Sequence, residues 1–272
     1  MNMDYLQYLR KDKMPHIWCD GCGHGIILKS ILRTIDTLGW EKDNIALISG
    51  IGCSGRTPGY VDFNTLHTTH GRAIAFATGL KLANPKLHVI VVTGDGDATA
   101  IGGNHFIHAA RRNLDINVIV FNNRIYGMTG GQCSPTTPTL KKSTTTPYGN
   151  PDSAFDISRL AEAAGASYVA RTTTFHVAKM DQYIKACFLK KGFSVVEAYS
   201  NCPTSYGKMN KETGRRGVDM LLYQKDNMVP IEKAKDMSDE ELQGKLVTGV
   251  FVDRNIPDYT ENYSIVKQNS KK

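Results

Sequence analysis

The chain has 272 residues, of which 41% are hydrophobic, so it can bury one large core or two small ones. Its formal net charge of +7 favours anionic partners, but the basic residues are scattered and form no nucleic-acid-binding motif. The first residues, MNMDYLQYLRKDKMP, include no apolar segment, and no later stretch is long enough to span a membrane. We therefore expect a cytoplasmic protein that binds neither nucleic acid nor membrane.

Helical and strand-like segments alternate along the first two hundred residues. Residues 25–38 carry apolar side chains at helical spacing and are followed by Gly39, which can end a helix. Short apolar runs of strand length follow, and the middle two are rich in Val and Ile, as buried parallel strands are. We expect strands at 45–49, 87–93, 116–121 and 194–199, and further helices at 71–83, 103–112, 157–164 and 177–190.

This alternation predicts an α/β fold, doubly wound around a mostly parallel sheet. Residues 136–152 and 206–217 are rich in Thr, Pro, Gly and Lys, so we expect loops rather than core there. We divide the chain into a main domain, residues 1–203, and a loop-rich C-terminal extension, residues 204–272, that packs on the same domain.

Polar residues and cysteines follow the ends of the expected strands. In an open parallel sheet, ligands bind beyond the carboxyl ends of the strands. Four such segments stand at 50–56, 94–97, 122–123 and 201–203, and a Cys-x-x-Cys pair precedes the first helix. We expect these five segments to meet at one edge of the sheet.

Asp95 and Asn123 follow neighbouring strands of this sheet. The glycines on both sides of Asp95 allow a sharp turn and a close approach to a ligand. A carboxylate and an amide oxygen suit Mg²⁺, which usually bridges to phosphates and so implies a diphosphate ligand. Taken alone, Gly-Asp-Gly is a weak signal, and an ordinary turn is the alternative.

The six cysteines are more readily metal ligands, reactive thiols or small core residues than disulfide partners in a reducing compartment. A thioredoxin-like pair fits poorly, because the Cys-x-x-Cys follows an N-terminal tail instead of a strand. We expect Cys187 to be a buried structural thiol and Cys133 to be a neighbour of the site. The expected ligand set is Cys19, Cys22, Cys53 and Cys202, which on ligand type alone would suit zinc as well as iron.

Several motifs between Trp18 and Pro203 resemble one family. They are WC-x-GCG at 18–23, GIGCSGR at 50–56, HTTHGRA at 67–73, GDGD at 94–97, GGNHF at 102–106 and YGMTGGQ at 126–132. Together they resemble the β subunits of 2-oxoacid:ferredoxin oxidoreductases, and most closely the 2-oxoglutarate type. Asp20 departs from the pattern, since the family often has proline there, which affects the rigidity of the loop more than ligation.

The resemblance implies thiamine diphosphate held through Mg²⁺ by Asp95, Asn123 and the backbone carbonyl of Ile125. It also implies one [4Fe-4S] cluster on the four cysteines and coenzyme A as co-substrate. The other residues implied in cofactor binding are Gly52, Cys53, His70, Gly94, Gly96, Asp97, Gly127, Met128 and Thr129.

The implied reaction is the oxidative decarboxylation of a 2-oxoacid to an acyl-CoA. Thiamine acts as an electron sink in such reactions, and a neighbouring iron–sulfur cluster can accept electrons whereas zinc cannot. The resemblance further implies an α subunit that contributes a glutamate to the cofactor, an (αβ)₂ assembly with or without small additional subunits, and ferredoxin as a separate electron carrier.

Individual residues have alternative interpretations. A carboxylate-binding role is the more probable one for Arg56, while His70 is as well explained by a structural role as by a diphosphate contact. His67 is a weaker candidate than His70, and His105 and His108 are expected to pack or cap. The alternative functions are a preference for pyruvate or branched-chain 2-oxoacids, a non-redox thiamine-dependent decarboxylase, and a zinc-binding module without thiamine.

Overall fold

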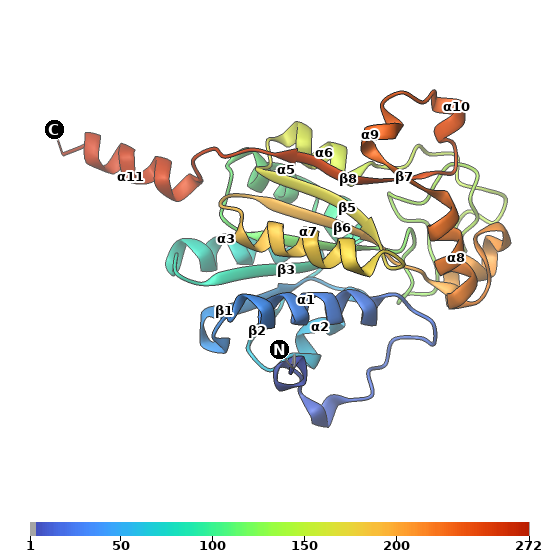
Figure 1. The fold of residues 1–272 in the computed structure, drawn as a ribbon, viewed down its shortest axis with the longest axis horizontal. Coiled ribbons are helices and arrows are strands. Elements are labelled where there is room, and N and C mark those ends of the chain that lie inside the picture. Colours follow the sequence, from blue (N-terminus) through green and yellow to red (C-terminus); the bar gives the residue numbers. More distant parts are fainter. Residues whose placement is uncertain (1–3, 272) are drawn as a thin grey trace.

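The computed structural model describes residues 4–271, and one eight-stranded sheet runs through it (Figure 1). The strand order is β2-β1-β3-β4-β6-β5-β8-β7, and all neighbours are parallel except β5 and β8. The strands are β1 (Ile45–Ser49), β2 (Asn64–His67), β3 (His88–Gly94), β4 (Asn117–Asn122), β5 (Tyr168–Thr173), β6 (Ser194–Tyr199), β7 (Met228–Pro230) and β8 (Leu246–Asp253).

Helices cover both faces of the sheet (Figure 1). One core cluster joins the sheet to α1 (His24–Leu38) and α7 (Val177–Leu189), and the other joins it to α3 (Ala73–Ala83), α5 (Gly103–Arg111) and α6 (Ile157–Ala164). Successive strand residues alternate between the two clusters, so Leu47 packs in the first and Ile48 in the second. This arrangement confirms the expected doubly wound α/β fold.

The expected elements are all present. Each of the four expected strands and five expected helices occurs, with its ends displaced by at most two residues. Gly39 ends α1 with φ +64°, and its N–H donates to the carbonyl groups of Asp36 and Ile35. The sequence did not reveal β5, because its segment YVARTT carries polar residues on a strand that is buried along its whole length.

The two polar runs differ from the expectation that they lie outside the core. Residues 136–152 contain no helix or strand, yet Thr137 and Asn150 are buried, and the Asn150 amide donates to the Thr137 carbonyl at 2.8 Å. The second run includes one π-helical turn, Pro203–Gly207, and one 3₁₀ turn, Lys211–Thr213. Small polar side chains that hydrogen-bond within their own loop can be buried without a strand or helix.

The chain after residue 203 adds to the same sheet. Strand β8 pairs with β5, and β7 pairs with β8. The helices of this part are α8 (Gly217–Asn227), α9 (Ile231–Ala234), α10 (Asp239–Leu242) and α11 (Tyr259–Asn269), of which α11 points away from the sheet (Figure 1). Two short helices, α2 (Thr57–Tyr60) and α4 (Asp95–Thr99), lie earlier in the chain. The division at residue 203 stays a prediction. Among residues 4–271, no helix combines the length and the apolar character needed to cross a membrane.

We predict that Ile31→Ala lowers the free energy of unfolding by about 2–5 kcal/mol, the usual effect of removing a buried branched side chain. Ile31 has no exposed surface and packs in the core cluster beneath α1. Chemical denaturation followed by circular dichroism measures the change. Thr37→Ala on the exposed side of the same helix is the control, and an equal loss there would contradict the assignment of this face to the core.

Candidate functional site

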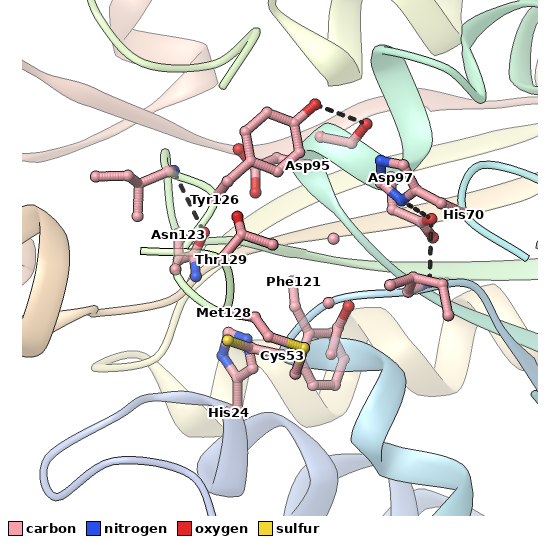
Figure 2. A pocket seen from close by; sticks show the side chains of 17 residues that line it. His24, Cys53, His70, Asp95, Asp97, Phe121, Asn123, Tyr126, Met128 and Thr129 are labelled. Carbon is pink, nitrogen blue, oxygen red and sulfur yellow. Dashed lines mark hydrogen bonds and ion pairs between the residues drawn. The ribbon is translucent and has the colours of Figure 1, made fainter. Parts of the chain in front are cut away.

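A cavity of about 240 Å³ lies where β1, β3 and β4 end (Figure 2). Parallel strands place their carboxyl ends at one edge, and the loops that follow them form the walls. Every residue expected to bind the cofactor lines this cavity, namely Gly52, Cys53, His70, Gly94, Asp95, Gly96, Asp97, Asn123, Gly127, Met128 and Thr129. The structure therefore brings these residues together from four separate segments of the chain.

Asp95 lies in the wall of the cavity with only 2% of its surface exposed. Its Oδ2 accepts hydrogen bonds from the hydroxyl groups of Ser134 at 2.6 Å and Thr136 at 2.5 Å. Burial raises the pKa of the Asp95 carboxyl, although these two hydroxyls act in the opposite direction. A carboxylate in this setting is stabilised most by a cation on its other oxygen.

The Asn123 amide and the Ile125 carbonyl lie beside Asp95. One terminal atom of the Asn123 amide lies 2.6 Å from the carbonyl oxygen of Ile125 and 3.2 Å from Oδ1 of Asp95. If that atom is nitrogen, it donates both hydrogen bonds; if it is oxygen, three oxygens face one another and a cation would relieve their repulsion. The donor set of carboxylate, amide and backbone oxygens fits Mg²⁺, with further positions left for phosphate oxygens and water.

A chain of buried polar groups supports this corner from behind. The Thr136 hydroxyl lies 3.0 Å from the amide oxygen of Asn122, and the Asn122 amide nitrogen donates to Glu197 at 2.7 Å. Arg171 donates from Nε to the same carboxylate at 2.7 Å and also pairs with Asp156. The orientation of Asp95 is thus connected to an ion pair between β5 and β6.

Ser134 and Thr136 were not expected at the site. They lie in a run of Ser, Thr and Pro with no periodicity, which is typical of an exposed loop. Their closeness in sequence to the YGMTGGQ segment was the only available signal.

The segment after Asn123 folds back on itself. Tyr126 N–H donates to the Gln132 carbonyl at 3.0 Å, and Gly131 N–H donates to the Tyr126 carbonyl at 2.8 Å. The Tyr126 ring fills the space where a side chain at Gly96 would project, so this glycine is required for the close contact. Burial raises the pKa of Tyr126 to about 12, which keeps its hydroxyl neutral.

The four expected cysteines lie near one another at the same end of the sheet. Two hydrogen bonds join their loops: Trp18 Nε1 donates to the Cys53 carbonyl at 2.7 Å, and Gly23 N–H donates to the Asn201 carbonyl at 3.1 Å. A Cβ atom added at Gly127 would lie 3.6 Å from Sγ of Cys53 and 3.7 Å from Sγ of Cys202. Two of the cysteines therefore border the loop that also lines the cavity.

The thiol groups are poorly suited to ionise by themselves. Burial is the main cause that raises the pKa of Cys22 to about 12 and that of Cys53 to about 11, and the neighbouring cysteines add to both shifts. Burial also raises the pKa of Cys202. In the described part of the chain, no three or more His, Cys, Asp and Glu side chains are spaced to hold a single metal ion.

The remaining candidates lie outside the cavity. Cys187 is fully buried in the core, which confirms the expectation of a structural thiol. Cys133 is half-buried, and its N–H donates to the Thr145 hydroxyl at 2.9 Å. Arg56 is exposed and does not line the cavity, but its charge is close enough to oppose the rise in the pKa of Cys53.

His24, at the start of α1, lines the cavity although the sequence gave no reason to select it. Its Nδ1 lies 2.8 Å from the Ser200 hydroxyl, and its ring meets Phe121 edge to face at 5.1 Å. Burial lowers the pKa of His24 to about 3, so the ring is neutral at physiological pH.

Comparison with known proteins agrees with this geometry. Residues 50–198 match the family model described as thiamine pyrophosphate enzyme, C-terminal TPP binding domain. The 2-oxoglutarate synthase subunit KorB of Methanocaldococcus jannaschii is 53% identical over 94% of this chain and 94% of its own length. The chain belongs to the thiamine-diphosphate-binding β subunits of the 2-oxoacid:ferredoxin oxidoreductases. Within this family it resembles the 2-oxoglutarate type, since the KorB subunit of Archaeoglobus fulgidus is also 48% identical over 96% of the chain.

A solved structure extends the likeness of this β subunit to three dimensions. The 2-oxoglutarate:ferredoxin oxidoreductase from Magnetococcus marinus, with 2-oxoglutarate, coenzyme A and succinyl-CoA bound, superposes with a TM-score of 0.87 and 35% identity. The match covers 99% of this chain and 91% of the other. It confirms the expected fold and the resemblance drawn from the motifs.

We predict that Thr136→Val weakens Mg²⁺ binding about 10- to 100-fold, the usual effect of removing a hydrogen bond to a metal ligand. Valine keeps the shape of threonine but cannot donate to Asp95. Calorimetric titration of Mg²⁺ in the presence of thiamine diphosphate measures the change. Thr139→Val is the matched control, because the Thr139 hydroxyl donates to the Asp152 carbonyl on the exposed part of the same loop.

Proposed function

We propose that this β subunit takes part in the oxidative decarboxylation of 2-oxoglutarate to succinyl-CoA and CO₂, with ferredoxin as the electron acceptor. The observation that carries the proposal is the position of Gly127, which belongs to the cavity wall and lies beside the sulfur atoms of Cys53 and Cys202. A carbon-centred redox reaction needs its electron acceptor next to the reacting cofactor. The names of the two KorB relatives support the choice of 2-oxoglutarate.

The cavity is proposed to hold thiamine diphosphate, which acts as the electron sink for decarboxylation when bound. Asp95, Asn123 and the Ile125 carbonyl would hold Mg²⁺, and the 127–129 segment would contact the diphosphate. The meeting of the Asp95 carboxylate, the Asn123 amide and the Ile125 carbonyl supports this assignment. The described chain contributes no glutamate to the cavity lining, so we assign the aminopyrimidine-side glutamate to an α subunit.

The four neighbouring cysteines are proposed to hold one [4Fe-4S] cluster, which would accept electrons and pass them to ferredoxin. Tetrahedral zinc would bring four sulfur atoms within about 4 Å of one another, given Zn–S bonds of about 2.3 Å. A four-iron cluster accommodates sulfur atoms that stand further apart, and no three of the described cysteines are spaced to hold a single metal ion.

The mouth of the cavity is proposed to lie against the α subunit in an (αβ)₂ assembly, with or without small additional subunits. Two apolar side chains that line the cavity are partly exposed, Ile51 at 40% and Met128 at 41%. They provide apolar surface for a partner to cover. Coenzyme A would enter as the acyl acceptor. The six free cysteines are consistent with a cytoplasmic location.

We predict that serine at Cys19, Cys22, Cys53 or Cys202 removes or converts the cluster, because each substitution deletes one thiolate ligand. Anaerobic purification followed by iron and sulfide analysis and electron paramagnetic resonance measures the effect. Cys187→Ser and Cys133→Ser are the controls and should keep the cluster. If Cys133→Ser destroys it while Cys202→Ser does not, the fourth ligand is Cys133.

The function itself is tested by turnover of the chain with its α subunit, 2-oxoglutarate, coenzyme A and a dye acceptor. We predict activity only in the combined complex, and a higher kcat/KM for 2-oxoglutarate than for pyruvate or 2-oxoisovalerate. Arg56→Met should reduce the value for 2-oxoglutarate most, because a guanidinium can pair with its second carboxylate. A preference for pyruvate in the unaltered complex would overturn the substrate assignment, and equal losses for all three acids would limit Arg56 to the shared carboxylate.

A further inference from the structure

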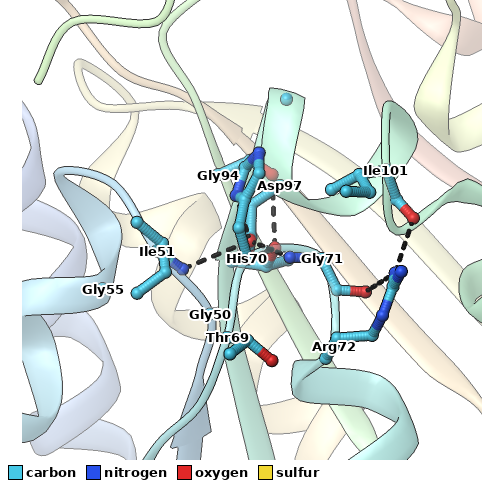
Figure 3. A network of polar contacts seen from close by, with 12 residues as sticks. Gly50, Ile51, Gly55, Thr69, His70, Gly71, Arg72, Gly94, Asp97 and Ile101 are labelled. Atoms are coloured by element: carbon cyan, nitrogen blue, oxygen red, sulfur yellow. Dashed lines mark hydrogen bonds and ion pairs between the residues drawn. The ribbon is translucent and has the colours of Figure 1, made fainter. Parts of the chain in front are cut away.

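One buried carboxylate connects three loops of the cavity wall (Figure 3). Asp97, in α4, is only 3% exposed. Its Oδ1 accepts from the backbone N–H groups of Ile51 at 3.2 Å and Gly71 at 2.6 Å, and lies 2.8 Å from Nδ1 of His70. Its Oδ2 accepts from the Thr93 hydroxyl at 2.7 Å. Both carboxylate oxygens of Asp97 thus accept hydrogen bonds from the protein itself.

The backbone around Asp97 leaves room for this carboxylate. A side chain at Gly50 would overlap the Asp97 oxygens. Gly71 has φ +69°, which favours glycine, and a Cβ there would come within 2.7 Å of the Gly102 nitrogen. Both glycines therefore allow the 50–52 turn and the start of α3 to approach the same carboxylate.

The contact with Asp97 determines how His70 faces the cavity. A carboxylate only accepts hydrogen bonds, so Nδ1 of His70 carries a hydrogen. Nε2 then faces another partner, and it donates to that partner when the ring also carries a hydrogen on Nε2. The His70 side chain is 38% exposed and lines the cavity, and its ring centre lies 6.2 Å from that of Tyr126, which leads into the 127–129 segment.

The charges of the cavity make His70 distinctive. Neither lysine nor arginine lines it in the described chain, and its other histidine, His24, is buried with Nδ1 against Ser200. Among residues 4–271, His70 is the one basic side chain that contacts the Asp97 carboxylate. A diphosphate placed at the 127–129 segment would therefore have His70 as a nearby basic side chain supplied by this chain.

We propose that Asp97 is a positioning residue, which holds His70 so that Nε2 of the ring donates a hydrogen bond to a diphosphate oxygen in the cavity. Asp97 itself does not touch the cofactor. The inference rests on the proposed function, because the anion is the diphosphate of thiamine diphosphate.

Conservative variants separate the charge of Asp97 from its shape. In Asp97→Asn the amide oxygen can keep its three partners, and the amide nitrogen faces the Thr93 hydroxyl. That hydroxyl can accept and turn its own hydrogen to the Gly94 carbonyl, which already lies 3.3 Å away. His70→Asn places an amide near Nδ1 but nothing at Nε2, whereas His70→Gln can extend an amide towards the position of Nε2.

The experiment is a double-mutant cycle on the dissociation constant of thiamine diphosphate, measured by calorimetry with Mg²⁺ on the full chain in complex with its partner subunit. We expect Asp97→Asn to weaken binding about tenfold, the effect of losing charge assistance on one hydrogen bond. His70→Asn should weaken it at least as much, and His70→Gln less. The double variant Asp97→Asn with His70→Asn should bind no worse than His70→Asn alone, because Asp97 acts through the ring.

Additive losses in the double variant would overturn the proposal, since they would show that Asp97 acts on the backbone of the loops independently of His70. Nitrogen NMR of the histidine rings in the unliganded chain gives a second readout, and a His70 ring without hydrogen on Nδ1 would also overturn it. Asp115→Asn is the matched control: Asp115 accepts from Gly192 N–H at 3.0 Å and pairs with Lys81 at 2.7 Å, before β4 begins. Absence of Mg²⁺-dependent binding by the unaltered complex would instead overturn the proposed function, and this inference with it.

Discussion

The hydroxyl groups that Ser134 and Thr136 donate to Asp95 occupy one oxygen of a carboxylate that is almost fully buried. Neutral donors cannot balance a buried negative charge as a cation can, and burial accordingly raises the pKa of this group. The Asn123 amide lies 3.2 Å from the other oxygen of Asp95 and 2.6 Å from the Ile125 carbonyl. The protein therefore fixes the orientation of the Asp95 carboxylate in the cavity wall but does not neutralise its charge.

Asp97 stands two residues further along the same short helix and has the opposite surroundings. Its oxygens are satisfied by two backbone N–H groups, a hydroxyl and an imidazole. One aspartate of the GDGD segment is thus left open to a ligand, while the other ties loops together. Apart from Thr93, the partners that cause this contrast lie between 26 and 46 residues away in sequence, so the motif could not show that Asp97 joins loops.

The parts of the fold and site that the sequence predicted are those with a periodic or family signal. The strands that end near Gly50 and Gly94 are apolar runs, and these glycines indicate where the chain turns. The position of Asp95 at the edge of the sheet could therefore be predicted. Thr136 could not be predicted, because its burial depends on how a long irregular loop closes over Asn122. Arg56 was expected to bind a substrate carboxylate. Its side chain is exposed, at the end of a short turn that leads directly into α2.

The strand order also dictates when each half of the sheet can form during synthesis. Strands β1, β3 and β4 are neighbours that leave the ribosome in sequence, so the corner around Asp95 and Asn123 can assemble once the loop through Thr136 has emerged. Strand β5 pairs with β4 only through β6, which is made later. Cys202 follows β6, so the first three cysteines wait without their fourth neighbour until about three quarters of the chain has been made. The corner around Asp95 and the group of four cysteines are therefore completed at different times during synthesis.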